Sequence, residues 1–177
     1  MKAVKNVNIS DLKVVARELR AGDTVSLSGT VYTARDAAHK RLVSMIERGE
    51  KLPFEIEGAV VYYAGPTPAK NGLAVGSCGP TTSSRMNPFA PRLIDLGLAG
   101  IIGKGQMSDE VKYALKRQGG IYFCAVGGAG ALAAKAIKKC DVIAFDELGC
   151  ESVKRMEVEN FSLIVGIDAA GNSIFEK

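Results

Sequence analysis

The sequence predicts an α/β domain built on a mixed sheet, and three observations support this. Apolar, β-branched segments alternate with helix-like segments through the second half of the chain, as expected when helices cover a sheet. The first half has strand-like segments but few helices, which indicates that the sheet is only partly parallel. The 177 residues contain no repeat and no linker. We therefore expect one domain over residues 1–177, with residues 1–22 as an N-terminal extension that carries a short helix.

Each predicted element rests on a local signal. Ser10 is placed to cap a short helix that ends near Gly22, Gly29 marks a bulge in a β-branched strand, Gly49 stops the next helix, and Ser108 caps another. The predicted helices cover residues 10–22, 34–46, 89–96, 108–118 and 129–139. The predicted strands cover residues 24–33, 59–64, 98–102, 121–126 and 142–145, and residues 163–168 and 173–175 form a closing hairpin.

Composition indicates an ordinary water-soluble protein. Hydrophobic residues make up 47% and charged residues 24% of the chain, and the net charge is +4. The basic residues are scattered rather than clustered, which favours acidic small molecules or an acidic partner over nucleic acid. No apolar run approaches the length of a membrane span and the N-terminus is polar, so we expect no membrane segment, no signal peptide and a cytoplasmic location.

The cysteines argue against a metal centre built by this chain alone. Cys78, Cys124, Cys140 and Cys150 form no Cys-x-x-Cys pair, and the chain has a single histidine. These spacings do not fit the usual zinc sites, and reduced, mostly buried thiols are the simpler interpretation.

A run of hydroxyl side chains is the strongest candidate site. Thr81, Thr82, Ser83 and Ser84 precede Arg85, where hydroxyls and backbone amides at a helix start attract anions. An arginine one turn later can bind a carboxylate or phosphate through two N–H groups. The alternative is a helix start capped by Ser83 and Ser84 with a solvated arginine.

Other polar residues follow predicted strands. Arg35 and Asp36 lie where a strand passes into a helix, His39 lies one helical turn later, and Lys104 stands between two glycines after an apolar strand. Because ligands of open α/β sheets bind where strand ends meet, one pocket could collect Arg35, Lys104 and the Thr81–Arg85 segment. The alternatives are that Asp36 and His39 only brace the helix and that Lys104 is a solvated turn residue.

A glycine pattern offers a competing hypothesis. Residues 128–133 fit G-x-G-x-x-A before a helix, and Asp146 follows the next predicted strand, as in dinucleotide-binding folds. Too little chain follows for the rest of such a sheet, so a glycine-rich turn for close packing is the preferred interpretation. A small NAD-binding module stays open as an alternative.

Four motifs follow one another along the chain: G-T at 29–30 with R-D-x-x-H at 35–39, Y-A-G-P at 63–66, G-P-T-T-S-x-R-M at 79–86 and I-G-K-G at 102–105. Together they resemble a known family, the β subunit of class I fumarate hydratase. That family also includes the β subunit of tartrate dehydratase and the C-terminal domain of single-chain enzymes.

The resemblance implies a swivelling β/β/α domain that completes its active site with an α subunit, in a hetero-oligomer such as (αβ)2. In this family the α chain binds a [4Fe-4S] cluster through three cysteines, and one iron stays open to the substrate. The implied reaction is reversible hydration of fumarate to (S)-malate, with dehydration of L-tartrate to oxaloacetate as the alternative. A more remote alternative is a non-catalytic dicarboxylate-binding module. We expect the chain alone to be inactive.

The resemblance also implies roles for individual residues. Arg35, Arg85 and Lys104 match the cations of the family that contact the dicarboxylate, and Thr81 and Thr82 match its paired threonines. Thr82 is the implied proton-abstracting group, and because a threonine hydroxyl is a weak base, a neighbour in the α chain has to activate it. Asp36, His39 and Ser83 are expected to support the site.

Overall fold

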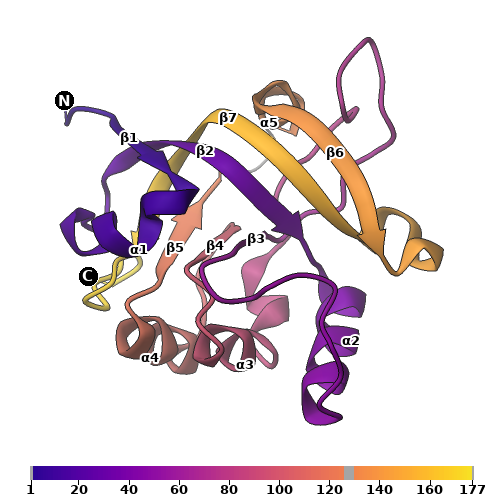
Figure 1. The fold of residues 1–177 in the computed structure, drawn as a ribbon. Coiled ribbons are helices and arrows are strands. Elements are labelled where there is room, and N and C mark those ends of the chain that lie inside the picture. The colour runs from indigo at the N-terminus through magenta and orange to yellow at the C-terminus, as the bar shows by residue number, and fades with distance from the viewer. Residues whose placement is uncertain (1, 126–129, 177) are drawn as a thin grey trace.

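The computed structural model describes residues 2–125 and 130–176, and within them seven strands form one mixed sheet (Figure 1). The predicted α/β class is confirmed. The strands are β1 (Lys5–Asn8), β2 (Thr24–Thr33), β3 (Val60–Tyr62), β4 (Gly100–Gly103), β5 (Ile121–Cys124), β6 (Ile137–Ala144) and β7 (Val153–Ile167). The helices are η1 (Ile9–Asp11), α1 (Leu12–Val15), η2 (Ala16–Glu18), α2 (Asp36–Glu47), η3 (Ser83–Met86), α3 (Ala90–Asp95), α4 (Asp109–Gln118), α5 (Gly130–Ala136) and η4 (Asp146–Glu151).

The strand pairings close the sheet on itself. β2, β3, β4 and β5 are parallel neighbours in that order. β7 pairs antiparallel with β5 at one end and with β2 along most of its length, which completes the ring. β1 extends β2 in parallel and β6 pairs antiparallel with β7 outside the ring. The sheet is therefore mixed, as the uneven distribution of predicted helices indicated.

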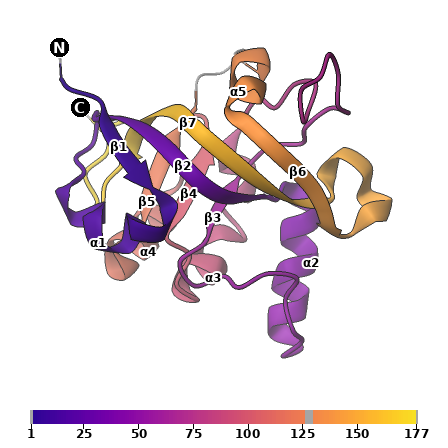
Figure 2. The same cartoon turned by 45° about the horizontal axis from the view of Figure 1, so that its top comes forward.

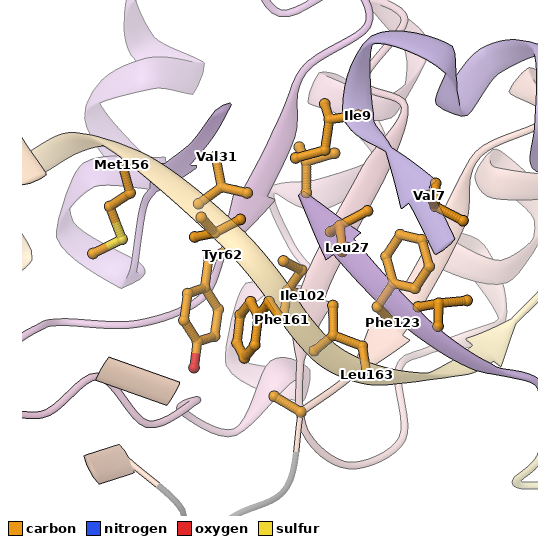
Figure 3. Close-up of a cluster of buried hydrophobic side chains, with 14 of the residues drawn as sticks. Val7, Ile9, Leu27, Val31, Tyr62, Ile102, Phe123, Met156, Phe161 and Leu163 are labelled. Carbon is orange, nitrogen blue, oxygen red and sulfur yellow. The ribbon is translucent and has the colours of Figure 1, made fainter. Parts of the chain in front are cut away.

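Two hydrophobic clusters lie on opposite faces of the strands. One contains strand side chains such as Leu27, Tyr62 and Phe123 (Figure 3). The other combines the alternate strand residues, such as Val61, with side chains of the helices, such as Leu93. Figure 1 shows α2, α3 and α4 together on that second side. Both faces of β3 are buried, which explains its uninterrupted apolar sequence.

The bulge expected at Gly29 is present. The register between β2 and β7 shifts between Leu27 and Gly29, and Gly29 has φ 129°. A side chain at this position would bring its Cβ to 3.0 Å from the Cβ of Ile9. Glycine therefore serves both the backbone conformation and the close approach of η1.

The predicted helix over 129–139 is partly wrong. Ala129 lies outside the described residues, α5 ends at Ala136, and β6 begins at Ile137. Cys140 on β6 faces Met156 on β7. The alanines and lysines of this segment have good helix propensity, but pairing with the long strand β7 overrides it.

Two terminal predictions also need correction. The segment expected to be one helix over 10–22 is divided among η1, α1 and η2. The predicted C-terminal hairpin is reduced to an isolated bridge between Ile167 and Ser173, because the first hairpin strand is the end of β7. At the N-terminus, β1 pairs with β2, and Leu12 and Leu19 are buried in the core.

Among the described residues, no helix combines the length and apolarity needed to cross a membrane.

Candidate functional site

The parallel strands bring the candidate residues to one edge of the sheet. β2, β3, β4 and β5 run in the same direction, so their carboxyl ends lie together. Arg35 follows β2, and Lys104 follows β4. Tyr63 follows β3, and its carbonyl accepts a hydrogen bond at 2.8 Å from the backbone amide of Thr81. These residues come from distant parts of the sequence and are held together by strand pairing.

Asp36 links the two candidate arginines. Its Oδ1 accepts a hydrogen bond from Arg85 Nε at 2.9 Å, and its Oδ2 lies 3.9 Å from Arg35 Nη2. Arg35 Nε faces a second carboxylate, since it lies 3.7 Å from Glu151 Oε1. Each arginine thus turns its Nε edge toward a carboxylate of its own chain. The terminal Nη groups are the part of a guanidinium that can then bind an added carboxylate.

His39 supports this arrangement through the backbone of Arg35. It is buried, and its Nδ1 lies 2.9 Å from the carbonyl oxygen of Arg35. A carbonyl can only accept, so Nδ1 carries the proton and donates. Burial lowers the pKa of His39 to about 4, against the opposing effects of the hydrogen bond to Arg35 and the charge of Asp36. The ring stands edge-on to Tyr63, with centroids 5.2 Å apart. His39 is therefore neutral near pH 7 and fixes the backbone of Arg35.

Thr82 and Lys104 lie side by side through a parallel β-bridge. Around them, the amide of Ser83 donates to the carbonyl of Lys104 at 3.0 Å, and the amide of Lys104 donates to Ser83 Oγ at 3.0 Å. Thr82 precedes η3, where its side chain makes no capping hydrogen bond, and it is exposed. Thr82 is thus an exposed threonine next to a lysine, and its hydroxyl does not cap the helix.

Ser83 does not cap the following helix, and that prediction is wrong. Its hydroxyl is buried and instead accepts the Lys104 amide, and it lies 2.9 Å from the hydroxyl of Tyr122. Tyr122 donates to the carbonyl of Gly105 at 2.7 Å. This network joins the segment that carries Thr82 to the turn that carries Lys104. Ser83 therefore supports the site from the interior.

Sequence reasoning missed Tyr122, Gly103 and Glu151 as parts of this site. A Cβ on Gly103 would lie 1.9 Å from Ser83 Oγ, so only glycine leaves room for the buried serine. Gly103 lies in the I-G-K-G motif, which gives a signal for it. No local pattern distinguishes Tyr122 from other apolar strand residues, or shows that the turn holding Glu151 returns to Arg35.

The arrangement suits a small anion with more than one carboxylate. Arg35, Arg85 and Lys104 supply three cations, and Thr81 and Thr82 supply hydroxyls. Arg85 and Thr82 are exposed, whereas the supporting residues His39 and Ser83 are buried. The described part of the chain has no group of three or more His, Cys, Asp or Glu that could hold a metal ion.

The glycine pattern at 128–133 lies partly outside the described residues, since Gly128 and Ala129 are among those left out. Gly130 opens α5, and its carbonyl accepts a hydrogen bond from the amide of Cys78 at 3.1 Å. A Cβ there would lie 2.3 Å from Ser77 Oγ. At Gly130, close packing accounts for the glycine, as preferred from the sequence.

Comparisons with known proteins agree with the resemblance found in the motifs. The chain matches the family described as Fumarase C-terminus over residues 1–177. It is 42% identical over 167 residues to a Methanocaldococcus jannaschii protein named "Putative L(+)-tartrate dehydratase subunit beta", and the match covers 91% of this chain and 86% of that protein.

Two longer relatives carry fumarate hydratase names. The chain is 43% identical over 159 residues to the mitochondrial fumarate hydratase 1 of Leishmania major. It is 39% identical over 155 residues to the aerobic class I fumarate hydratase of Escherichia coli strain K12. Each match covers 86% of this chain but only 28% of the longer protein.

Proposed function

Since this chain belongs to the Fumarase C-terminus family, we propose that it is the β-type half of an iron–sulfur hydro-lyase that reversibly hydrates fumarate to (S)-malate. One observation carries the proposal. Two arginines have their Nε edges turned toward carboxylates of the chain, beside a lysine and an exposed threonine at the same sheet edge. This is the cationic part of a dicarboxylate site.

A C4 dicarboxylate fits this set of groups. It carries two negative charges, and removal of a proton next to a carboxylate adds further negative charge in the transition state. Arg35 and Arg85 bind one carboxylate through their Nη groups, and Lys104 stabilises the charge that develops next to Thr82. Thr81 and Thr82 donate hydrogen bonds to the substrate. Donors fixed in advance by the buried network beneath them need little rearrangement during the reaction.

Thr82 is assigned the proton-transfer role. The residue is exposed and its hydroxyl does not cap η3, which leaves the hydroxyl available to a substrate. A threonine needs a neighbouring base to accept its proton, and we assign that base to the partner chain.

The proposal assigns the [4Fe-4S] cluster to a partner α subunit. The donor set of this chain does not fit a cluster, because its four cysteines are separate free thiols and the described residues hold no three-ligand group. The name of the M. jannaschii relative, a subunit beta, supports a two-subunit assembly. We propose a cytoplasmic hetero-oligomer such as (αβ)2.

Dehydration of L-tartrate to oxaloacetate is the second candidate. The observation in its favour is the M. jannaschii relative, which is matched over 86% of its own length and is named for tartrate. Tartrate and malate share two carboxylates and a hydroxyl next to one of them, so the same cations serve either substrate.

Anaerobic activity assays test the proposal. The chain is assayed alone and after mixing with its cluster-loaded α partner, with fumarate, L-malate and L-tartrate in parallel. Turnover of fumarate and malate that appears only on mixing supports the proposal. Turnover of L-tartrate alone selects the second candidate, and no turnover in a formed, cluster-loaded complex rejects both in favour of a binding module.

A further inference from the structure

The turn before β7 is organised by a buried lysine. Lys154 Nζ donates to Ser152 Oγ at 2.8 Å, to the carbonyl of Cys150 at 3.1 Å, and to the carbonyls of Gly149 and Ser152 at 3.3 Å each. Lys154 is only 8% exposed, and burial lowers its pKa. An ammonium with three protons surrounded by four oxygens is fully satisfied, and it holds those oxygens together.

The same turn is fixed to the end of β2. Thr33 Oγ1 donates to the carbonyl of Ser152 at 3.3 Å and accepts from the amide of Lys154 at 3.1 Å. Gly149 adopts φ 61° and ψ −122°, which interrupts η4 and favours glycine. Figure 2 shows this turn, between β6 and β7, beside the start of α2. The turn therefore has one shape and one position relative to β2.

That position brings Glu151 to Arg35. A Cβ on Gly65 would lie 3.1 Å from the carbonyl oxygen of Cys150 and 3.4 Å from Arg35 Cδ, so the three segments meet there. Glu151 Oε1 is 3.7 Å from Arg35 Nε. Both atoms are buried and neither has another hydrogen-bond partner among the described residues. A shift of under about 1 Å makes the contact a charge-assisted hydrogen bond.

We propose that Lys154 is a positioning residue for Arg35, acting through the 149–152 turn and Glu151. Without the ammonium, three carbonyls that now share its protons need other donors, and the turn opens toward water. Glu151 then leaves Arg35, whose guanidinium gains rotational freedom and no longer presents its Nη edge in one direction. The kinetic consequence rests on the proposed function, whereas the contact itself is a property of this chain.

A spectroscopic experiment on the full-length chain tests the contact directly. The Arg35 Nε–H signal is recorded by 15N NMR and assigned by its loss in Arg35→Lys. We expect Glu151→Gln and Lys154→Met to move this signal to the same position, that of a solvated arginine. Lys138→Met, which removes an exposed lysine bonded to a single carbonyl, should leave it unchanged.

An unchanged Arg35 signal in folded Lys154→Met overturns the inference. If Lys154→Met does not fold, Ser152→Ala replaces it, because it removes only the shortest of the four lysine contacts. This variant should shift the Arg35 signal part of the way toward the position in Glu151→Gln, and no shift overturns the inference.

Kinetics in the assembled enzyme separate positioning from general stability. We expect Glu151→Gln and Lys154→Met each to raise KM for the dicarboxylate about tenfold, with kcat changed less than about threefold. The double variant should be no worse than either single one, because both act on Arg35 by one route. Additive effects overturn the inference. If the wild-type assembly turns over no dicarboxylate, the proposed function fails and the NMR result still decides the role of Lys154.

Discussion

Replacing Gly103 by alanine should destabilise the fold at the base of the site. The added Cβ would lie 1.9 Å from Ser83 Oγ and 3.3 Å from Tyr63 Cδ2, so the buried hydroxyl has to move. It would then lose its contacts to the Lys104 amide at 3.0 Å and to the Tyr122 hydroxyl at 2.9 Å. Overpacking costs about 1–3 kcal/mol and each unsatisfied buried group about 1–3 kcal/mol. Because Tyr122 keeps its hydrogen bond to the carbonyl of Gly105, the overpacking and the unsatisfied Lys104 amide together cost about 2–6 kcal/mol.

Urea unfolding of the full chain measures this loss. The control is Gly79→Ala, since a Cβ there meets its nearest neighbour, Gly130 Cα, at 3.6 Å, an ordinary contact. The control should change the free energy of unfolding by less than about 1 kcal/mol. Ser83→Ala removes the oxygen that clashes, so the added Cβ in the double variant faces the Ser83 Cβ position at 3.2 Å. The double variant should lose clearly less than the sum of the single losses.

Wild-type stability in Gly103→Ala would refute the reasoning. So would strict additivity with Ser83→Ala, because the clash is the only route by which the two positions are expected to interact. Either result would mean that Ser83 can leave its buried site at little cost, and that it does not fix Lys104.

Three further predictions concern the site residues. Thr82→Ala in the assembled enzyme should lower kcat by about 10²–10⁴-fold while complex formation is unchanged, and near-normal turnover would remove Thr82 from the mechanism. Arg85→Lys keeps the charge but loses the planar fork, so KM for the dicarboxylate should rise about tenfold or more; an unchanged KM would argue against two-point carboxylate binding. The third uses pH: the pKa of His39, about 4 in the folded chain, lies below its ordinary value of 6.5. Between these values the unfolded chain binds a proton that the folded chain does not, so stability falls as pH drops through this window, by about 3 kcal/mol in all. His39→Asn should flatten this part of the stability profile measured by urea unfolding, and an equal slope in both proteins would contradict the assignment.

The sequence predicted most of the elements whose signals are local. The β-branched run of β2 with its bulge at Gly29, the capped helix α4 and the fully buried β3 follow from side-chain period, capping residues and glycine. Ser108 Oγ accepts the amide of Val111, as its position predicted. The helix over 129–139 failed because residues 137–144 pair with β7, and that pairing depends on a strand far away in the chain.

The convergence of candidate residues at one sheet edge was predictable to the same extent. Arg35 and Lys104 were expected to converge because both follow predicted strands, and the parallel pairing of these strands places them at one edge. The partners that orient them were not predictable. Glu151 reaches Arg35 only because the 149–152 turn folds back, and Tyr122 reaches Ser83 only because β5 lies next to β4. Contacts of this kind join residues that are far apart in the sequence, and no spacing pattern predicts them.

The burial pattern of the site explains why a second chain would matter to its chemistry. The residues that hold the site, His39, Ser83 and Tyr122, are buried, whereas Arg85 and Thr82 are exposed to water. An ion pair at an exposed position is worth little, because water and salt screen it. In the proposed assembly, the α subunit covers this edge, excludes water and strengthens the attraction between the cations and the dicarboxylate. The isolated chain should therefore bind fumarate weakly and with strong salt dependence, and the assembled enzyme should bind it with much weaker salt dependence.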